Sequence, residues 1–325
     1  MKKIVLYDTS IATHNLGDFI INESINHELA ELIENNYVVR YGTHTPIAKV
    51  YQQILKPNKY IREADYRFLC GTNIFGTNLL RPVPNFNINI FDINLYKNCI
   101  SIGCGIGRDK GSPEYTVYSK CIYKHILSRE YIHSVRDEET VEFLQDLGFQ
   151  AINTGCPTLW QLDSAHCSRI PKEKSNKVVF TITDYAKNDL ADSAMIDQLE
   201  ANYDEIYMWL QGTGDLQYSK RLLENRKVKI IPPSLEAYRK FLKETDVDYV
   251  GTRLHAGIFA MQHMKRTIII SVDHRATKMS ETHNIPIIER ENIAELDELI
   301  NTSFETNIII DSTLINKWKA QFDVK

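Results

Sequence analysis

Short apolar runs alternate with amphipathic stretches along the first half of the chain. The runs predict buried strands at residues 3–7, 37–41, 66–70, 98–103, 131–135 and 151–154. Helical spacing of apolar residues predicts helices at 18–34, 115–127 and 137–147, and in the first of these Ile21, Ile25 and Leu29 recur on one side. Strands that alternate with helices favour a parallel sheet with helices on both faces.

The same alternation restarts after a polar segment, DSAHCSRIPKEKSNK at 163–177, which is the best linker candidate. It predicts strands at 178–183, 205–210, 227–231, 248–250, 267–272 and 285–288, with helices at 189–202, 215–225, 234–244, 254–264, 275–283 and 291–301. We therefore expect an α/β protein with two doubly wound, Rossmann-like domains at 1–165 and 176–311, and a C-terminal helix at 312–325 that packs across them. The asparagine-rich NFNINIFDIN at 85–94 predicts an irregular loop or an edge strand.

The length of 325 residues exceeds the size at which one hydrophobic core usually stops growing, which agrees with two domains. The formal charge is −4, from 38 basic and 42 acidic residues, so we expect no nucleic-acid partner and only a local site for any anion. The N-terminal apolar run is too short for a signal peptide and no stretch reaches membrane-spanning length, so we expect a cytoplasmic protein. Neither the ten histidines nor the six cysteines have metal-binding spacing, which predicts no metal, no cofactor and reduced, mostly buried thiols.

Ligands of open parallel sheets bind outside the carboxyl ends of the strands, so the strand-to-helix junctions are the candidate sites. The first junction, HNLGD at 14–18, offers Asn15, Gly17 and Asp18. Asp18 is a natural N-cap for the following helix, and Gly17 permits a sharp turn. The alternative is that the turn admits a substrate close to the backbone and that Asp18 binds a hydroxyl or acts as an acid or base.

Two glycine-rich junctions, GTNIFGTN at 71–78 and IGCGIG at 102–107, follow further predicted strands. Their candidate residues are Gly71, Asn73 and Gly105. The spacing does not match GxGxxG, and the chain also lacks a GxSxG elbow, a GxxxxGK[ST] loop and the kinase motifs. The glycines indicate either tight turns or a floor of backbone N–H groups that faces an anionic or sugar ligand.

A fourth junction, SVRDEET at 134–140, joins a predicted strand to a helix for which Asp137 is the expected N-cap. The carboxylates of Asp137, Glu138 and Glu139 complement the helix dipole. Arg136 lies at the unfavourable end of that dipole. Its side chain therefore either extends to solvent or faces a bound anion.

The fifth junction, GTRLHAGIFA at 251–260, places Arg253 and His255 at the first turn of a strongly apolar helix that Gly251 or Thr252 can cap. An anion there would gain the helix N–H groups, a guanidinium and an imidazole donor. The alternative is a surface arginine with a core histidine. The next junction, DHRATK at 273–278, follows a neighbouring strand. Four basic side chains are expected to converge on this edge of the sheet: Arg253, His255, Arg275 and Lys278.

Taken in chain order, six segments resemble the polysaccharide pyruvyl transferase family: NLGD at 15–18, GTN at 71–73, IGCGIG, SVRDEET followed by LGF, TGCPTLW at 154–160, and TRLHAGIFAMQ at 252–262. The resemblance covers essentially the whole chain. It implies the two-domain fold of GT-B glycosyltransferases. It also implies transfer of the enolpyruvyl group of phosphoenolpyruvate onto a sugar of a surface polysaccharide (exopolysaccharide) precursor, with formation of a pyruvate ketal and release of phosphate. The expected partners are thus phosphoenolpyruvate as donor and a saccharide acceptor, free or lipid-linked, which leaves peripheral membrane contact open.

Carried over by motif, Arg253, Leu254 and His255 match the family's Arg-Leu-His donor site, and Arg136 matches the arginine of its RDEE-like segment. The resemblance implies that Arg136 and Arg253 bind the anionic groups of the donor. It also implies that His255 contacts the phosphate and, when protonated, acts as general acid. Arginines can neutralise a leaving phosphate, so this scheme requires no metal.

The base that assists ketal closure would be Asp18 or Asp137. The chain departs from the Tyr-Asp-x-Lys arrangement of the family, because SVDHRATK at 271–278 has no tyrosine and places Lys278 five positions after Asp273. This departure leaves the acceptor or the donor open. One alternative is a nucleotide-sugar glycosyltransferase of GT-B fold, in which Arg253 and Lys278 hold a diphosphate. The other is a non-catalytic glycan- or anion-binding protein.

Overall fold

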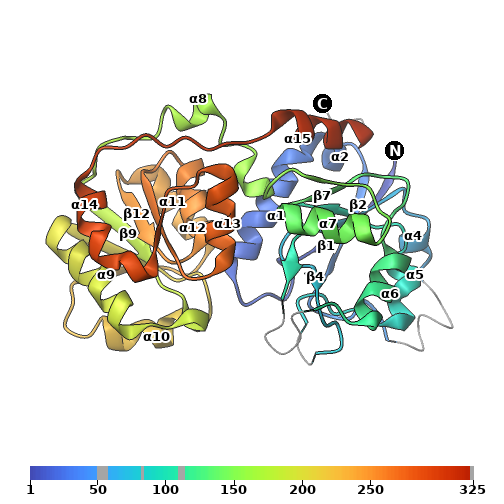
Figure 1. Ribbon diagram of the computed structural model, residues 1–325, viewed down its shortest axis with the longest axis horizontal. Coiled ribbons are helices and arrows are strands. Elements are labelled where there is room, and N and C mark those ends of the chain that lie inside the picture. The colour runs from blue at the N-terminus through green and yellow to red at the C-terminus, as the bar shows by residue number, and fades with distance from the viewer. Residues whose placement is uncertain (50–57, 82–83, 109–113, 323–325) are drawn as a thin grey trace. The chain divides into compact units, whose positions relative to one another are not determined.

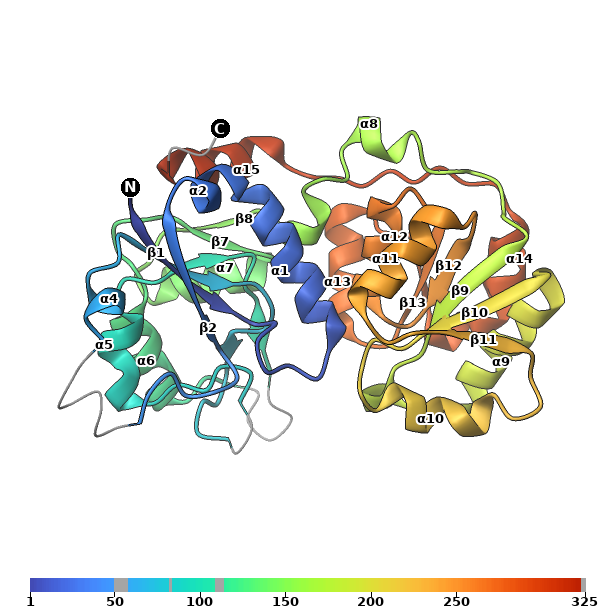
Figure 2. The same cartoon turned by 180° about the vertical axis from the view of Figure 1, so that it is seen from behind.

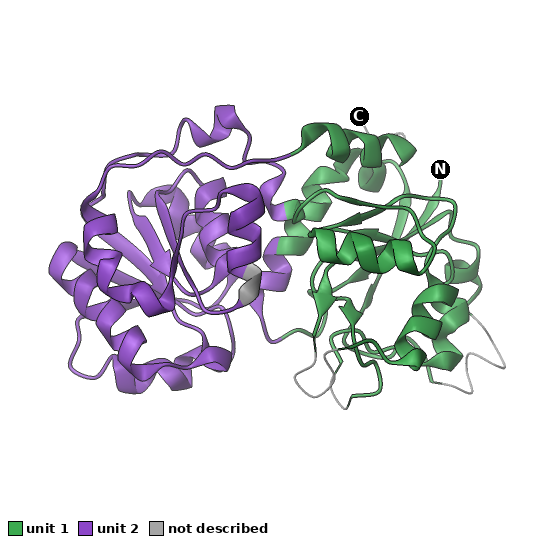
Figure 3. Cartoon of the chain, viewed as in Figure 1, with its two compact units in different colours: residues 1–13, 21–157, 311–325 green, residues 14–20, 158–310 purple. Residues whose placement is uncertain are grey.

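The computed structural model describes residues 1–49, 58–81, 84–108 and 114–322, without the side chains of His274 and Arg275. Contacts between residues group the chain into two compact units (Figure 3). Unit 1 consists of residues 1–13, 21–157 and 311–325, and unit 2 of residues 14–20 and 158–310. Residues 14–20 are thus grouped with the second half of the chain. The ranges 1–165 and 176–311 stay a sequence-based prediction of domain limits.

Unit 1 is built around a parallel sheet of order β2-β1-β3-β5 (Figure 1). Its strands are β1 (Lys3–Asp8), β2 (Tyr37–Gly42), β3 (Tyr66–Cys70) and β5 (Ile100–Ile102). Two further parallel pairs are β4 (Phe75–Gly76) with β6 (Ile106–Gly107) and β7 (His133–Val135) with β8 (Ala151–Asn153). Because β1 pairs with both β2 and β3, the strand order reverses between β1 and β3.

Helices cover both faces of the unit 1 sheet. They are α1 (Leu16–Glu28), α2 (Ala30–Glu34), α4 (Lys59–Arg62), α5 (Ile93–Tyr96), α6 (Val117–Ile126), α7 (Glu138–Asp146) and α15 (Ser312–Lys319), followed by the 3-10 turn η5 (Ala320–Phe322). Alternate strand residues face opposite sides of the sheet. On one side Tyr7 packs against Tyr96 of α5, with ring centroids 4.4 Å apart. On the other, Phe68 packs against Trp318 of α15, at 6.1 Å. The C-terminal helix is therefore part of the unit 1 core.

Unit 2 contains a parallel sheet of order β11-β10-β9-β12-β13-β14. Its strands are β9 (Lys177–Thr181), β10 (Glu205–Trp209), β11 (Val228–Ile231), β12 (Asp248–Gly251), β13 (Thr267–Ser271) and β14 (Ile287–Glu289). Numbered within the unit, this order is 3-2-1-4-5-6, which is that of dinucleotide-binding Rossmann domains. The strand order reverses between β9 and β12.

The helices of unit 2 lie on both faces of its sheet (Figures 1 and 2). They are α8 (Ser164–Cys167), α9 (Asp189–Asn202), α10 (Asp215–Leu222), α11 (Leu235–Glu244), α12 (Leu254–Gln262), α13 (His274–His283) and α14 (Leu296–Asn301), with 3-10 turns η2 (Pro157–Leu159), η3 (Asp184–Ala186) and η4 (Arg290–Glu295). Phe180 faces α9, α10 and α14 in one buried cluster. On the opposite face Trp209 stacks on Tyr238 of α11, with ring centroids 4.2 Å apart. Alternate strand residues thus pack against helices on opposite faces of the sheet.

The structure departs from the expected elements at a few positions. The single helix expected at 18–34 is interrupted at Leu29 and forms α1 and α2. The loop or edge strand expected at 85–94 is wrong for its second half, where η1 (Ile90–Asp92) leads into α5. Asn89 caps this turn in a capping box with Asp92, so local side-chain bonds decide its conformation. The expected linker contains α8, capped by Asp163.

None of the six cysteines, all of which lie in the described residues, forms a disulfide. Five are buried and Cys121 is exposed. Burial raises the pKa of Cys104 to about 12. The expectation of reduced, mostly buried thiols is confirmed.

Candidate functional site

The candidate site in unit 2 lies where its strand order reverses, which is the position at which such sheets bind ligands. Thr181 ends β9 and Gly251 ends β12, and these two residues are register partners. A Cβ on Gly251 would collide with Thr181, so glycine allows the two strands to approach this closely. The residues that follow both strands, η3 after β9 and Arg253 after β12, therefore meet at one sheet edge.

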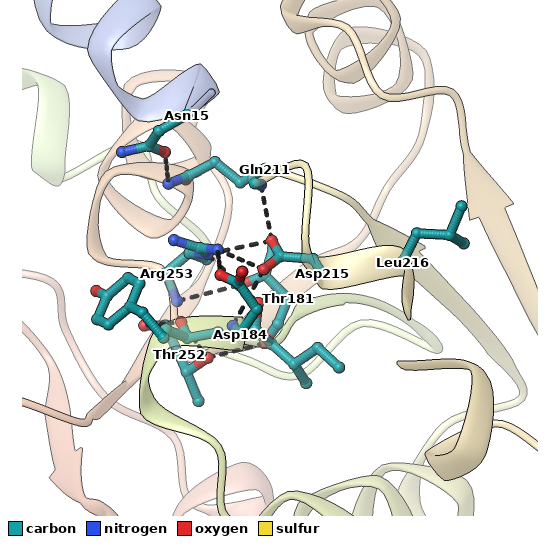
Figure 4. A network of polar contacts seen from close by, with 12 residues as sticks. Asn15, Thr181, Asp184, Gln211, Asp215, Leu216, Thr252 and Arg253 are labelled. Atoms are coloured by element: carbon teal, nitrogen blue, oxygen red, sulfur yellow. Dashed lines mark hydrogen bonds and ion pairs between the residues drawn. The ribbon is translucent and has the colours of Figure 1, made fainter. Parts of the chain in front are cut away.

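Arg253 is buried, and its guanidinium binds two carboxylates (Figure 4). Its Nη2 donates to Oδ1 of Asp184 at 2.9 Å and to Asp215, and its Nε donates to Oδ2 of Asp215 at 3.2 Å. The ring of Tyr185 lies over the guanidinium, with 5.1 Å from Cζ to the ring centroid. The backbone amide of Arg253 donates to Oγ1 of Thr181 at 3.2 Å. Thr181, Asp184, Tyr185, Asp215 and Arg253 are called the Arg253 network below.

Asp215 anchors this network from the first turn of α10, where it is fully buried. It accepts from the backbone amides of Gly212 at 2.8 Å and Asp184 at 3.2 Å, in addition to Arg253. Burial raises the pKa of the Asp215 carboxyl, and the Arg253 guanidinium opposes that rise. A Cβ on Gly212 would collide with Arg253, and one on Gly214 with Asp184. The glycines of QGTGD at 211–215 therefore allow both acids to reach the guanidinium.

The charges in the network change the interpretation of Arg253. The alternative of a surface arginine with a core histidine is wrong, because Arg253 is buried while His255 is only half-buried. One guanidinium faces two carboxylates, which bond to its Nε and Nη2 and compensate its charge. Asp184, whose side chain is 33% exposed, is the more accessible of the two, since Asp215 is fully buried.

Residues 14–20 lie against the 211–215 loop. Asn15 and Gly212 form an antiparallel bridge, and Oδ1 of Asn15 accepts from Nε2 of Gln211 at 2.8 Å (Figure 4). A Cβ on Gly17 would crowd Nε2 of Gln211 at 2.9 Å. Asn15 and Gly17 of the HNLGD junction thus lie next to the loop that carries Asp215.

The expected N-cap of the first helix is wrong. α1 begins at Leu16, so Asp18 lies within its first turn. Oδ1 of Asn15 accepts from the amide of Gly17 at 3.0 Å, and this places Asn15 in the capping role. Asp18 is buried, and its role as a binding or acid–base group stays a prediction.

At the start of α12, Arg253 itself occupies the N-cap position without a side-chain cap bond, so the capping expected from Gly251 or Thr252 is wrong. Oγ1 of Thr252 donates instead to Oγ1 of Thr183 at 2.9 Å. Leu254 and His255 are the first two residues of the helix and both are half-buried. The two residues therefore lie at the positive end of the helix dipole.

The basic residues expected beside Arg253 lie on the next helix along the sheet. Arg275 and Lys278 belong to α13, which follows β13, and β13 pairs in parallel with β12. The carboxyl ends of these two strands meet at one edge, as expected. Lys278 is exposed, whereas the side chain of Arg275 lies outside the described atoms.

The candidate site in unit 1 is centred on Arg136, which follows β7 and is buried. Its Nη2 donates to Oδ1 of Asn73, and its Nε lies 3.5 Å from Oδ2 of Asp137. A Cβ on Gly105 would collide with the guanidinium, so this glycine provides the space in which it lies. The alternative in which Arg136 extends to solvent is wrong. Asn73, Gly105, Arg136 and Asp137 are called the Arg136 cluster below.

The glycine-rich loops form tight turns, and their glycine amides do not provide an anion floor. The amide of Gly71 donates to O of Ile102 at 2.9 Å, and that of Gly105 to O of Thr72 at 2.9 Å. Gly71 has a φ of 69°, in the left-handed region that favours glycine. The two loops thus bond to each other, and this pairing holds Asn73 and Gly105 next to Arg136.

Asp137 is the N-cap of α7, as expected. Its Oδ1 accepts from the amide of Thr140 at 2.8 Å and from Oγ1 of Thr140 at 2.6 Å, while its Oδ2 lies near Arg136. Both carboxylate oxygens of Asp137 therefore have partners within the protein. This arrangement suits a residue that orients Arg136 better than one that removes a proton from a substrate.

Three residues of this site were not predicted from the sequence: Asp184, Gln211 and Asp215. Their signal was present, because Asp184 follows the strand at 177–181 and QGTGD follows the strand at 205–209. Both segments follow strands whose carboxyl ends lie at the sheet edge that carries Arg253. The junction rule applied to the other strands would have selected them.

The family model of the polysaccharide pyruvyl transferases matches residues 15–274, which include Arg136, Arg253 and His255. The chain belongs to the polysaccharide pyruvyl transferase family. It is therefore a transferase, and the family implies a saccharide acceptor. No curated protein matches the chain.

Solved structures similar to the chain include the S. aureus MnaA–UDP co-structure, with a TM-score of 0.57, 12% identity and coverage of 100% of this chain and 98% of that chain. Another is the UDP-GlcNAc 2-epimerase from Neisseria meningitidis bound to UDP-GlcNAc, with a TM-score of 0.46, 11% identity and coverage of 100% and 95%. The likeness to the first concerns the fold. It confirms the expected class of two Rossmann-like α/β units of GT-B type.

None of the helices in the part of the chain that the structure describes combines the length and the apolar composition that a membrane span needs. Within the same residues, no group of three or more His, Cys, Asp or Glu side chains is placed to hold a metal ion.

Proposed function

We propose that this pyruvyl transferase family member moves the enolpyruvyl group of phosphoenolpyruvate onto a sugar of a surface polysaccharide precursor and closes a pyruvate ketal. A proton adds to C3 of the donor, and a sugar hydroxyl attacks the oxocarbenium-like C2. The C2–O bond to phosphate then breaks. A second hydroxyl attacks C2, so two hydroxyl protons are lost, one of which balances the proton added to C3 and the other leaves with phosphate.

The family match over residues 15–274 is the observation that carries this proposal. Among the buried arginines that the structure describes in the matched range, Arg136 and Arg253 each follow a strand of a parallel sheet. A donor with a phosphate and a carboxylate needs permanent positive charges, and guanidinium groups bind both anions in bidentate fashion. We assign Arg136 and Arg253 to these two groups.

The two arginines enter this scheme from different starting states. Arg136 donates to the uncharged amide of Asn73 and has one carboxylate, that of Asp137, 3.5 Å from its Nε. The Nε and Nη2 groups of Arg253 bond to two carboxylates, those of Asp184 and Asp215. An anion that binds Arg253 therefore competes with Asp184 for the guanidinium charge, while the buried Asp215 keeps the side chain in place.

His255 is the proposed general acid and phosphate contact, because it lies at the first turn of α12 beside Arg253. Asp18 is the proposed base for ketal closure, since both oxygens of Asp137 accept hydrogen bonds or lie near Arg136. Lys278, exposed on α13, is assigned to the acceptor. Asn15, Gly17, Gly71 and Gly105 shape the loops around these groups.

The reaction is tested by incubating the protein with phosphoenolpyruvate and a panel of glycosides that carry vicinal or 1,3-related hydroxyl pairs. The expected result is equimolar release of inorganic phosphate and a ketal methyl resonance in the NMR spectrum of the glycoside. His255→Asn should abolish both. Consumption of a nucleotide sugar with no use of phosphoenolpyruvate would overturn the proposal in favour of glycosyl transfer.

Single substitutions test each arginine by itself. Arg136→Lys and Arg253→Lys each keep the charge and lose the bidentate geometry. Each variant should bind phosphoenolpyruvate more weakly, which calorimetric titration measures. An unchanged dissociation constant would remove that arginine from the donor assignment.

A further inference from the structure

Exposed apolar side chains gather around the first turn of α6 in unit 1. Val117, the first residue of this helix, is 85% exposed, and Ile90 and Phe91 of η1 are 54% and 56% exposed. The amide of Ile90 donates to the hydroxyl of Tyr118 at 3.1 Å, which fixes η1 beside this turn. Leu80, 67% exposed, follows Leu79, whose amide donates to Ser119 at 3.0 Å.

The α6 apolar patch is therefore made of four side chains from three segments: Leu80, Ile90, Phe91 and Val117. Single exposed apolar residues are ordinary on a protein surface, but a group of this kind marks an interaction surface. Figures 1 and 2 both show α5 and α6 side by side. The hydrogen bonds of Ile90 with Tyr118 and of Leu79 with Ser119 hold the three segments together at the first turn of α6.

Basic residues flank the patch. Lys120 and Lys124 lie three and seven positions after Val117 on α6, so helical spacing places them on the same face. Both are exposed, as is Lys97 directly after α5. Glu114 is an exposed carboxylate near the start of α6, so the residues named around the patch are three lysines and one acid. The local charge is positive although the chain as a whole is negative.

A second highly exposed apolar residue has the opposite surroundings. Leu190 in the first turn of α9 is 87% exposed, but the same turn carries Asp189 and Asp192. The two carboxylates of this turn are repelled by an anionic surface. Leu190 is therefore a matched control for the residues of the α6 apolar patch.

We propose that the α6 apolar patch and its lysines dock unit 1 on the surface of an anionic lipid bilayer. Apolar side chains of this kind insert at the boundary between headgroups and acyl chains, and nearby lysines are attracted to anionic headgroups. The charge complementarity selects this occupant. An apolar patch flanked by lysines offers little to a neutral surface beyond the apolar contact, and a second copy would bring the same lysines against each other. The inference is independent of the transferase chemistry.

The experiment measures co-sedimentation of the full chain with vesicles of phosphatidylcholine alone and of equal parts phosphatidylcholine and phosphatidylglycerol. The expected result is binding to the anionic vesicles that falls at high salt, and at least tenfold weaker binding to phosphatidylcholine. The variant Phe91→Ser/Val117→Ser should lose at least tenfold in binding to anionic vesicles, and so should Lys120→Gln/Lys124→Gln. Leu190→Ser should bind like the unchanged protein.

The substituted side chains are exposed, so each variant is expected to fold. A cooperative thermal unfolding transition checks this for each variant. Absence of binding by the unchanged, folded protein would overturn the proposal, and so would equal losses in Leu190→Ser. Self-association that disappears in Phe91→Ser/Val117→Ser, without vesicle binding, would overturn it in favour of a second copy of the chain. Phosphate release with a water-soluble glycoside reports on the transferase proposal alone and is not expected to change in these variants.

Discussion

Arg136 in unit 1 and Arg253 in unit 2 are both buried arginines that follow a strand of a parallel sheet, yet their partners differ in charge. Arg136 donates to the amide oxygen of Asn73 and lies above Gly105. Arg253 donates to the carboxylates of Asp184 and Asp215. The same residue type at equivalent positions therefore has either one carboxylate nearby, Asp137 at 3.5 Å from Nε of Arg136, or two that bond to the guanidinium, as at Arg253.

This difference separates two tasks that an arginine motif in the sequence does not distinguish. A buried guanidinium with one partly exposed acid nearby keeps more of its charge for an anion. A buried guanidinium between two acids is held in a fixed orientation, and binding an anion then depends on how easily one acid leaves. Four predictions test this comparison, from the largest expected effect to the smallest.

Removal of Asp215 should have the largest effect. Asp215→Ala leaves the buried Arg253 with only the more exposed Asp184, and we expect the free energy of unfolding to fall by about 3–5 kcal/mol. Asp184→Ala should cost less than about 1 kcal/mol, because exposed pairs contribute little. Urea unfolding followed by tryptophan fluorescence measures both. Equal losses would show that the two acids do not differ in role.

His133 and Asp215 should respond to acid in opposite directions. Burial lowers the pKa of His133, in β7 of unit 1, to about 4. The unfolded chain therefore binds the proton first, and this residue's contribution to stability, about 3 kcal/mol, is lost as pH falls from about 6.5 to 4. Burial raises the pKa of Asp215, so the folded chain binds its proton first and that contribution increases as pH falls toward the unfolded pKa.

The free energy of unfolding measured at several pH values checks this prediction. In His133→Asn the loss of stability between pH 6.5 and 4 should be smaller, whatever the stability of this variant at neutral pH. In Asp215→Asn the free energy of unfolding should fall more steeply as the pH is lowered, because a group that favours the folded state in acid is absent. An unchanged slope in either variant would contradict the assignment.

Gly105→Ala should displace Arg136, because the added Cβ collides with the guanidinium. We expect a loss of stability of about 1–3 kcal/mol and weaker binding of phosphoenolpyruvate. Gly76→Ala is the matched control on a neighbouring loop, since its Cβ would meet its nearest atoms at 3.8 and 3.9 Å. Calorimetric titration with phosphoenolpyruvate measures the binding. Equal affinities for the two variants would remove Arg136 from the donor site.

Asp184→Asn should have the smallest effect on stability and an effect of opposite sign on binding. The amide leaves Arg253 with one carboxylate, so an anion no longer competes with Asp184. We expect the dissociation constant for phosphoenolpyruvate to fall by about threefold to tenfold, the scale of a partly exposed ion pair. The same titration measures it. Weaker binding in this variant would mean that Asp184 itself contacts phosphoenolpyruvate.

Much of the fold could be predicted from the sequence, because buried parallel strands appear as apolar runs. The strands at 3–8, 66–70 and 177–181 differ from their predicted bounds by at most two residues. Short elements were missed where side-chain caps decide the conformation, as at Asn89 before η1 and Asp163 before α8. Such local bonds leave no periodic pattern.

The candidate site was less predictable than the fold. The junction rule and the family motifs identified Arg136, Arg253 and His255, and the structure places each after a strand or in the first turn of a helix. The two acids that bind Arg253, Asp215 and Asp184, come from segments 38 and 69 residues away in the sequence. A sequence motif records the arginine but does not record the acids that surround it.

The placement of residues 14–20 has a practical consequence for anyone who divides this protein. O of His14 accepts from the amide of Thr213 at 3.1 Å, and the amide of Leu16 donates to O of Gln211 at 2.9 Å. A fragment cut at residue 158 would leave these backbone groups, and the loop that carries Asp215, without their bonding edge. A fusion of residues 14–20 to that C-terminal fragment would restore the missing backbone partners.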